Sequence, residues 1–180
     1  MIDLKDELNL IDNVQIKNFV IGCLDIAPDY FWKIPSSSTG KYHPKDEIKE
    51  GGLILHVKRS VKIATDLCRC FEVVGDDRDC VISAMIMHDV CKNGYPVDAG
   101  HTVDGHGSLW INIAMHVSNK MLILNSKTIR LIGRLIGGHM GRFDMPFIGS
   151  ENILDWIVQS SDYISSRDYV IVNVNEENNV

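Results

Sequence analysis

The sequence predicts an all-helical protein, and three observations support that fold class. Apolar residues recur at helical spacing over most of the chain, and no alternating strand pattern competes with them in its middle. The chain has 180 residues, which is within the usual size of one domain. Its composition, 45% hydrophobic and 23% charged, allows it to bury a substantial core without disulfides or structural zinc. We therefore expect one compact helical domain over residues 1–180.

The first predicted helix covers about Val14 to Ile26 and ends before Pro28. A segment rich in Pro, Ser and Gly then runs as far as residue 52. Irregular segments of this length are usually functional or disordered. Three adjacent aromatic residues within it, Tyr30, Phe31 and Trp32, favour a loop that packs against the core.

The most regular helix is predicted from Leu53 to about Phe71, where apolar residues follow one helical face. The next runs from Asp79 to His88, places His88 on an otherwise apolar face, and is stopped by Asn93 and Gly94. The remaining predicted helices cover about His106 to Met121, Ser126 to Gly137 and Asn152 to Tyr169. The tail YVIVNVNEENNV has β-branched residues followed by polar ones, which predicts a short edge strand or a frayed end.

Charge, cysteine content and the N-terminus narrow the class of protein. The net charge of -6 disfavours binding by broad neutralisation of a nucleic-acid backbone, although a bound metal ion would still admit a small anionic substrate. The N-terminus is acidic where a signal peptide would be basic, and no apolar run is long enough to cross a membrane. The five cysteines are an odd number without CxxC spacing, which favours free, mostly buried thiols. We therefore expect a cytoplasmic protein without membrane partners, in which the acidic residues at the N-terminus and at Asp76, Asp77 and Asp79 are solvated.

Histidines and aspartates mark the ends or inner faces of separate predicted helices: His56, His88 with Asp89, His106, His139 and Asp162. Helices packed side by side bring inward-facing residues together, and bundles commonly hold metal sites between facing helices. Imidazole and carboxylate groups suit Mn, Co, Ni, Zn or Fe, whereas Mg prefers oxygen ligands. A single buried histidine is more often a hydrogen-bonded core residue than a ligand, so a metal site is predicted from the whole set.

Five segments that contain these residues resemble, in order, the motifs of HD-superfamily phosphohydrolases: GGLILH (51–56), MIMHDVCKNG (85–94), GHGSLW (105–110), GGHMGRFD (137–144) and SDYISSRD (161–168). The order of His, His-Asp, His, His and Asp is the family's, and this ordered set carries the resemblance. The segment SSSTGKYHP (36–44) is similar to one in small HD proteins of bacteria and phages. The resemblance spans residues 36–169 and implies an HD-type helical bundle there, preceded by an N-terminal helix and loop (1–35) and followed by a tail (170–180).

The resemblance also implies a ligand set. Four residues would bind one metal ion, and the third of them could bridge to a second ion: His56, His88, Asp89 and Asp162. His106 and His139 match the positions that hold this second ion in binuclear members. Many of those members have two consecutive histidines where this chain has His139 followed by Met140. One ion, with His106 and His139 meeting substrate or water, therefore stays an alternative to two, and the expected cofactor is Mn, Co, Ni, Zn or Fe, with Mg as a further alternative.

The chemistry implied is hydrolysis of a phosphate ester or anhydride, because a bound metal ion generates hydroxide at neutral pH and polarises a phosphoryl oxygen. Asp89 is then a catalytic residue. Cations would stabilise the charge that develops on the phosphoryl group, Lys92 first and Arg142 second. These two would also contact substrate, together with Lys41, Tyr42 and His43. Each of the five has a simpler alternative as a surface or loop-packing residue.

The resemblance indicates the type of reaction more specifically than it indicates the substrate. A short chain has room for the catalytic bundle and little else, which favours a small phosphorylated molecule of the nucleotide kind, as in a 5'-nucleotidase or a dNTP hydrolase. A cyclic-nucleotide phosphodiesterase or a 3'-5' exonuclease of the same superfamily is an alternative. A non-catalytic HD module that binds a nucleotide or a protein partner is another, which the intact ligand set disfavours. The oligomeric state stays open, a homo-oligomer included.

Overall fold

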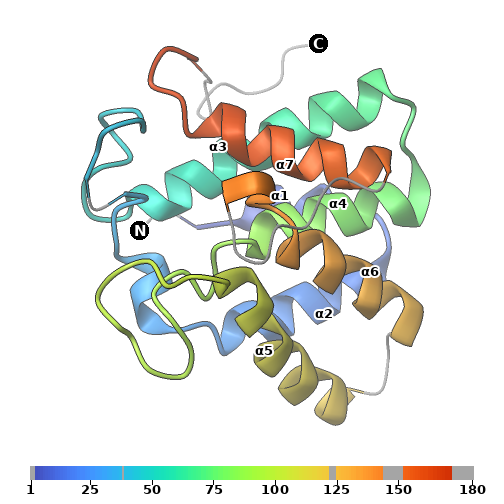
Figure 1. The fold of residues 1–180 in the computed structure, drawn as a ribbon. Coiled ribbons are helices and arrows are strands. Elements are labelled where there is room, and N and C mark those ends of the chain that lie inside the picture. The colour runs from blue at the N-terminus through green and yellow to red at the C-terminus, as the bar shows by residue number, and fades with distance from the viewer. Residues whose placement is uncertain (1–2, 38, 122–124, 144–151, 172–180) are drawn as a thin grey trace.

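The computed structural model describes residues 3–37, 39–121, 125–143 and 152–171, without the side chains of 119–121 and 142. Within these ranges the chain forms helices and no strand, which confirms the all-helical fold class. The α-helices, shown in Figure 1, are α1 (Lys5–Asn9), α2 (Val14–Asp25), α3 (Gly52–Cys70), α4 (Gly75–Met87), α5 (His106–Met121), α6 (Ser126–Gly137) and α7 (Ile153–Ser165). Two 3-10 helices, η1 (Asp29–Trp32) and η2 (Gly141–Phe143), lie in the connections.

Helix α4 occupies the interior of the bundle, where it contacts α1, α2, α3, α6 and α7 (Figure 1). Every residue from Asp79 to Met87 is buried. A helix enclosed on all sides carries apolar residues on all its faces, which is why this stretch has no polar stripe. His88 and Asp89, the pair on which the metal prediction depends, follow directly at the C-terminal end of this enclosed helix.

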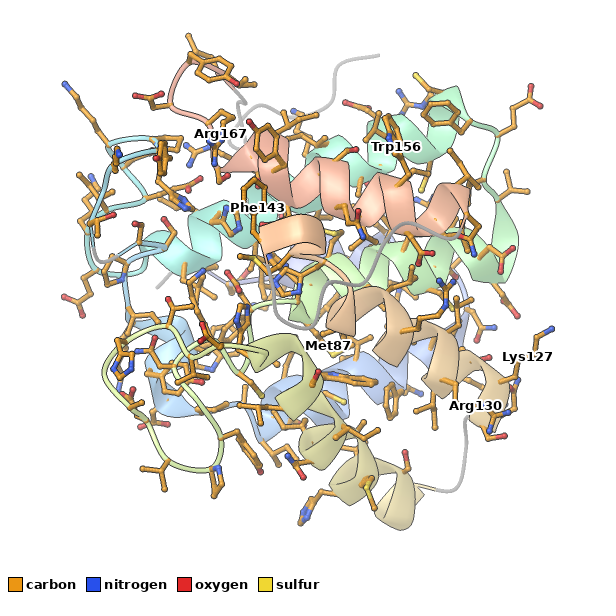
Figure 2. The ribbon with its side chains drawn as sticks, viewed as in Figure 1. Met87, Lys127, Arg130, Phe143, Trp156 and Arg167 are labelled. Atoms are coloured by element: carbon orange, nitrogen blue, oxygen red, sulfur yellow. The ribbon has the colours of Figure 1, made fainter. Side chains whose placement is uncertain are left out.

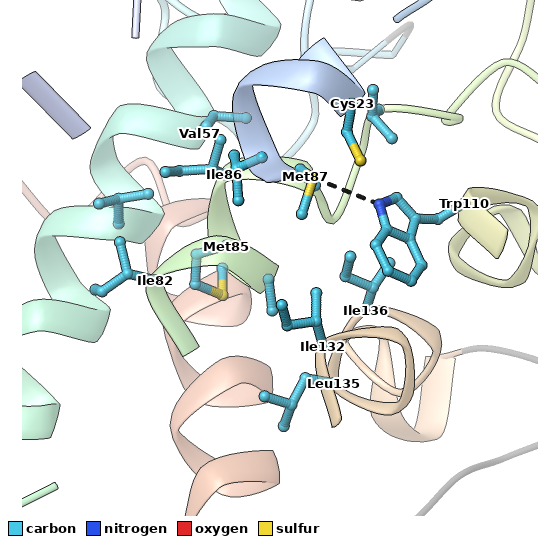
Figure 3. Close-up of a cluster of buried hydrophobic side chains, with 14 of the residues drawn as sticks. Cys23, Val57, Ile82, Met85, Ile86, Met87, Trp110, Ile132, Leu135 and Ile136 are labelled. Atoms are coloured by element: carbon cyan, nitrogen blue, oxygen red, sulfur yellow. Dashed lines mark hydrogen bonds between the residues drawn. The ribbon is translucent and has the colours of Figure 1, made fainter. Parts of the chain in front are cut away.

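The core beside α4 is organised around Trp110 on α5 (Figure 3). Its indole Nε1–H donates to the sulfur of Met87 at 3.4 Å, and its ring meets that of Phe19 edge to face at a centroid distance of 6.1 Å. Burying a Trp ring is most favourable when its N–H finds a partner, as here. These contacts hold α5 against α2 and α4, one turn from the first residue of α5, His106.

The helix boundaries agree with the prediction except at two ends. Asn13 caps α2 by accepting from the N–H groups of residues 15 and 16, and a capping box of Asn152 and Asp155 opens α7. Helix α4 begins at Gly75, four residues earlier than predicted, because its first turn is acidic, which stabilises a helix N-terminus but adds nothing to an apolar pattern. Helix α7 ends at Ser165, not Tyr169, because the chain then turns so that a backbone N–H, that of Asp168, donates to the carbonyl of Tyr42 at 2.8 Å.

The expectation of solvated acidic residues was wrong in two places. Asp79 is buried and accepts a hydrogen bond from the backbone N–H of Asn13 at 2.7 Å. Glu7 lies on α1, a helix that the sequence pattern did not predict, and its carboxylate pairs with Lys58 at 2.8 Å. Both carboxylates are partnered by groups more than fifty residues away, so local sequence carries no sign of them.

The predicted packing of the aromatic loop is confirmed. Tyr30 and Phe31 are buried, and Trp32 meets Phe31 edge to face at 5.0 Å. The hydroxyl of Tyr30 donates to the carbonyl of Gly94 at 2.6 Å, which ties this loop to the end of the His-Asp motif.

Three further expectations concern cysteine, membranes and the tail. All five cysteines are free, and all but Cys70 are buried, as predicted. Among the helices in the described ranges, none is long and apolar enough to span a bilayer. Val170 and Ile171 form no strand, and the rest of the predicted edge strand lies outside the described residues.

Gly52 allows the loop before α3 to approach that helix closely. A Cβ atom at this position would lie 1.8 Å from the carbonyl oxygen of Glu47, which is backbone and cannot rotate away. Gly52 of the GGLILH motif is thus explained by packing, and Gly51 by its left-handed backbone at φ 74°. The absence of a side chain at Gly52 lets Glu47 reach the inner face of α3.

We predict that Gly52→Ala destabilises the protein by about 1–3 kcal/mol, because the loop must move to admit the methyl group. Gly137→Ala is the matched control, since a Cβ there meets no atom within 4 Å and alanine favours the helix. Chemical denaturation of both variants measures the difference. Equal stabilities for the two variants would show that the close approach is not constraining.

Candidate metal centre

Five helices deliver the predicted ligands to one buried region. His56 comes from α3, His88 and Asp89 from the end of α4, His106 from the start of α5, His139 from just beyond α6, and Asp162 from α7. The four histidines and Asp89 are each at most 2% exposed, and the Asp162 side chain is 16% exposed. The predicted convergence of these six side chains is therefore confirmed as geometry.

The six side chains form two groups that share Asp89. In the first group, His56 Nε2 lies 3.2 Å from His88 Nε2 and 3.0 Å from Asp162 Oδ1. Both nitrogen atoms lie within 3.9 Å of Asp89 Oδ2. In the second group, His106 Nε2 lies 2.9 Å from Asp89 Oδ1 and 3.1 Å from the Nε2 of His139. Each carboxylate oxygen of Asp89 thus faces a different group.

Backbone carbonyls orient three of the imidazole rings in the same way. The Nδ1 atoms of His88, His106 and His139 lie 2.8, 3.1 and 2.7 Å from the carbonyl oxygen three residues earlier in each case. A carbonyl can only accept, so each Nδ1 carries the proton and donates it. In a neutral imidazole the Nε2 atom then bears a lone pair.

His56 is oriented by a side chain instead. The Ser165 hydroxyl donates to the carbonyl of Asp162 at 2.8 Å, which leaves its oxygen to accept from His56 Nδ1–H at 3.2 Å. In the neutral form of each ring, the Nε2 atom therefore bears a lone pair, and the Nε2 atoms of both groups face one another and the two carboxylates.

Such a donor set fits a divalent transition metal. Acceptor nitrogen atoms about 3 Å apart repel one another unless a cation lies between them, and metal-bound histidines usually donate their other N–H to a carbonyl or carboxylate. The His56, His88, Asp89 group and the Asp89, His106, His139 group each have ligand atoms within 4.8 Å of one another. The two groups could hold one metal ion each.

A second layer of charge supports His56 from behind. Glu47 is fully buried, and its carboxylate accepts from Arg59 and from His43 Nδ1 at 2.8 Å. Burial would raise the pKa of Glu47, but hydrogen bonds from His43, His56 and Arg59 outweigh it and lower the pKa to about 2. Burial likewise opposes the charged form of His56, yet Asp162 and Glu47 raise its pKa to about 9.

The two aspartates are held ionised by their neighbours. Burial alone would raise both pKa values, but the Lys92 ammonium and the histidines around Asp89 bring the pKa of its carboxyl well below its usual range. Hydrogen bonds with His56 and His88 do the same for the pKa of Asp162. Lys92 Nζ lies 2.6 Å from Asp89 Oδ2. The site therefore presents two ionised carboxylates to a cation.

A cavity of about 1100 Å³ opens above these groups. Four members of the groups line it, namely His56, Asp89, His139 and Asp162. Of the predicted substrate residues, Tyr42, His43 and Lys92 line it as well. Lys41 is absent from the described lining, and its ammonium lies 5.1 Å from the ring centroid of Tyr42. Met140 also lines the cavity, next to His139.

Arg142 belongs to η2, but its side chain lies outside the described residues, so its role stays a prediction. Several lining or supporting residues were not foreseen from the sequence: Glu47, Phe143, Trp156, Tyr163, Ser165 and Arg167. Figure 2 shows Phe143 and Arg167 close to each other above the bundle, with Trp156 further along α7. Three of the six, namely Tyr163, Ser165 and Arg167, stand within the SDYISSRD segment, in which the sequence predicted a role only for Asp162. No local sequence pattern predicts the role of Glu47, because it stands in a polar loop that is buried only through contacts with distant parts of the chain.

No protein-family model, curated protein or solved structure matches this chain at a significant level. The interpretation of the site therefore depends on its own residues and geometry.

We predict that Ser165→Ala weakens divalent metal binding about 10-fold or more, because His56 loses the acceptor that sets its tautomer. Ser161→Ala on the same helix is the matched control, since among the described residues the buried Ser161 hydroxyl has no hydrogen-bond partner. Removing an unpartnered buried hydroxyl leaves stability unchanged or raises it. Calorimetric titration with Mn²⁺ measures both affinities, and an unaltered affinity in Ser165→Ala would contradict the orienting role.

Proposed function

We propose that this protein is a metal-dependent phosphohydrolase that cleaves a phosphate ester or anhydride in a nucleotide-like small molecule, with 5'-nucleotidase or dNTP hydrolase activity favoured. The observation that carries the proposal is the pair of His/Asp groups that share Asp89 at the base of a cavity. The resemblance of the five ordered motifs to HD-superfamily phosphohydrolases supports the same reaction class.

Two metal ions suit this site better than one. The oxygens of Asp89 point to different groups, His106 and His139 form their own short contacts, and each group offers ligand atoms from at least three residues. Met140 does not remove the second position, because His139 already presents Nε2 to Asp89 at 3.7 Å. The four histidines favour Mn, Co, Ni, Zn or Fe over Mg.

A bound divalent ion would supply an activated water and polarise a phosphoryl oxygen. Residues of the chain would hold the ligand groups in place, stabilise the developing charge and assist the leaving oxygen. Asp89 holds the two groups together, and Lys92 places a positive charge at the cavity wall where negative charge grows on the phosphoryl group. His43 lines the cavity and donates Nδ1–H to Glu47, which orients its ring, and in its imidazolium form it would carry a second N–H, at Nε2, for the leaving oxygen.

The cavity and the charge of the chain favour a small substrate. Its volume of about 1100 Å³ slightly exceeds the range of most small-molecule sites, about 300–1,000 Å³, and it is large enough for a nucleotide. A net charge of -6 opposes the broad backbone contacts of an exonuclease. Five free cysteines fit a reducing compartment such as the cytoplasm.

The test is a phosphate-release screen over nucleoside mono- and triphosphates and cyclic dinucleotides with Mn²⁺, Co²⁺, Zn²⁺ or Mg²⁺. We expect the wild type to bind at least one transition-metal ion per chain and to release phosphate or pyrophosphate. His88→Ala loses bound metal and activity together, whereas His116→Ala, an exposed histidine of α5, keeps both. A wild type that binds less than one ion per chain after reconstitution and releases nothing would falsify the proposal.

We further predict that Lys92→Ala leaves metal bound but lowers kcat about 100-fold, because its charge acts on the transition state more than on the ground state. Lys127→Ala is the control for loss of one positive charge, since Lys127 is exposed at the start of α6, away from the site (Figure 2). Steady-state kinetics and elemental analysis of the same samples measure the two effects. Loss of metal along with activity in Lys92→Ala would instead indicate that Lys92 serves to hold Asp89.

A further inference from the structure

Arg167 lies at the wall of the cavity, directly after the end of α7 (Figure 2). Its guanidinium lies over two aromatic rings, with its central carbon 4.4 Å from the ring centroid of Tyr163 and 5.0 Å from that of Tyr42. Its Nε–H donates to the carbonyl of Tyr163 at 3.2 Å, and Nη2 donates to the hydroxyl of Ser166 at 2.8 Å. The side chain is thus held in place by contacts from both the loop before α3 and the end of α7.

The charge of Arg167 has no counterpart in the described part of the chain. No carboxylate there forms an ion pair with it, whereas other cations of the bundle are paired, such as Arg59 with Glu47 and Lys58 with Glu7. Lys92, the other described cation in the cavity lining, is already committed to Asp89 at 2.6 Å. Arg167 is therefore the described lining cation whose charge is free for a ligand.

The aromatic contacts determine which part of Arg167 a ligand can reach. Nε–H and one Nη2–H already donate to Tyr163 and Ser166, so the edge formed by Nη1 and Nη2 is the part of the guanidinium that a ligand can reach. Such an edge matches the oxygens of a phosphate or carboxylate, often with two parallel hydrogen bonds. Because Tyr42 and Tyr163 already restrict the side chain, less rotational entropy is lost when an anion binds. This arrangement is suited to an anion and poorly suited to stacking a base on the guanidinium.

The position of Arg167 relative to Asp162 sets what it can contact. Asp162 stands in the last turn of α7, and Arg167 lies two residues beyond the end of that helix. Both residues line the same cavity. One molecule could therefore present one anionic group to the His/Asp groups and another to Arg167.

We propose that Arg167 is a specificity-determining residue that binds a second anionic group of the substrate, so that the protein prefers phosphorylated molecules with two anionic groups over those with one. This inference depends on the proposed function for the placement of the first group. It adds that a nucleoside diphosphate or triphosphate is preferred to a monophosphate.

The experiment compares two probes on Mn²⁺-loaded protein by calorimetry. The 5'-methylenephosphonate analogue of adenosine monophosphate carries one anionic phosphorus group and resists cleavage, and α,β-methylene adenosine 5'-diphosphate carries two and resists cleavage between them. Charge-assisted hydrogen bonds of one arginine are worth about 10- to 100-fold in affinity. We expect Arg167→Gln to weaken the diphosphate analogue by that factor and the monophosphate analogue by less than about 3-fold.

Two further variants make the result specific. Arg167→Lys keeps the charge but loses the planar edge, so its affinity for the diphosphate analogue falls between those of the wild type and Arg167→Gln. Arg130→Gln removes an exposed arginine on α6, away from Arg167 (Figure 2), and leaves both affinities unchanged. Thermal unfolding confirms that each variant is folded, and Arg167→Lys carries the test if Arg167→Gln is not.

The inference is overturned if Arg167→Gln weakens both probes equally, if it weakens neither, or if the wild type binds neither probe. These outcomes are separate from failure of the proposed function, which is read from metal content and phosphate release in the wild type. A protein that binds the diphosphate analogue through Arg167 without hydrolysing any phosphate would retain this inference and lose the hydrolase.

Discussion

The buried carboxylate of Asp89 is the constraint on which the rest of the structure depends. An ionised carboxylate at 1% exposure is strongly unfavourable unless cations and hydrogen-bond donors surround it. Lys92 meets one of its oxygens and His106 the other, while backbone carbonyls take the Nδ1–H groups of the neighbouring imidazoles, so that in their neutral form the Nε2 lone pairs face the site. The combination is favourable when positive charge lies between these atoms, which is the physical reason to regard the site as a candidate metal centre.

The fold meets this constraint by bringing helix ends together where little room exists. Helix α4 is enclosed on all sides and ends at the His-Asp pair, while Trp110 holds α5 so that its first residue reaches Asp89. Gly107 permits that approach, since a Cβ there would lie 2.5 Å from the carbonyl oxygen of Ile136 and 3.1 Å from His139 Nδ1. Gly52 does the same for the loop that carries Glu47. Gly52 and Gly107 are thus points where backbone segments meet closely.

An acidic protein can still select an anionic substrate if its positive charge is concentrated. The net charge of -6 is spread over the whole chain, whereas one cavity is lined by four of the six candidate ligands, by Lys92 and by Arg167. Local fields in a partly enclosed cavity are screened less by water than surface charges are. The same concentration favours a compact phosphorylated molecule over a polymer, whose contacts would extend over the acidic surface.

The sequence by itself determined the helical class, most helix boundaries and the six candidate ligands, because apolar periodicity and an ordered set of His and Asp residues are local properties of the chain. It did not reveal α1, the burial of Asp79 or the role of Glu47, whose partners lie far away in sequence. It also left open whether the ligands form one group or two, since Met140 beside His139 could be interpreted either way. Only the tertiary structure decided that the two oxygens of Asp89 face different groups and that the Arg167 guanidinium lies over the rings of Tyr42 and Tyr163. Those facts depend on how helix ends from distant parts of the chain are positioned relative to one another, and helical spacing carries no information about that.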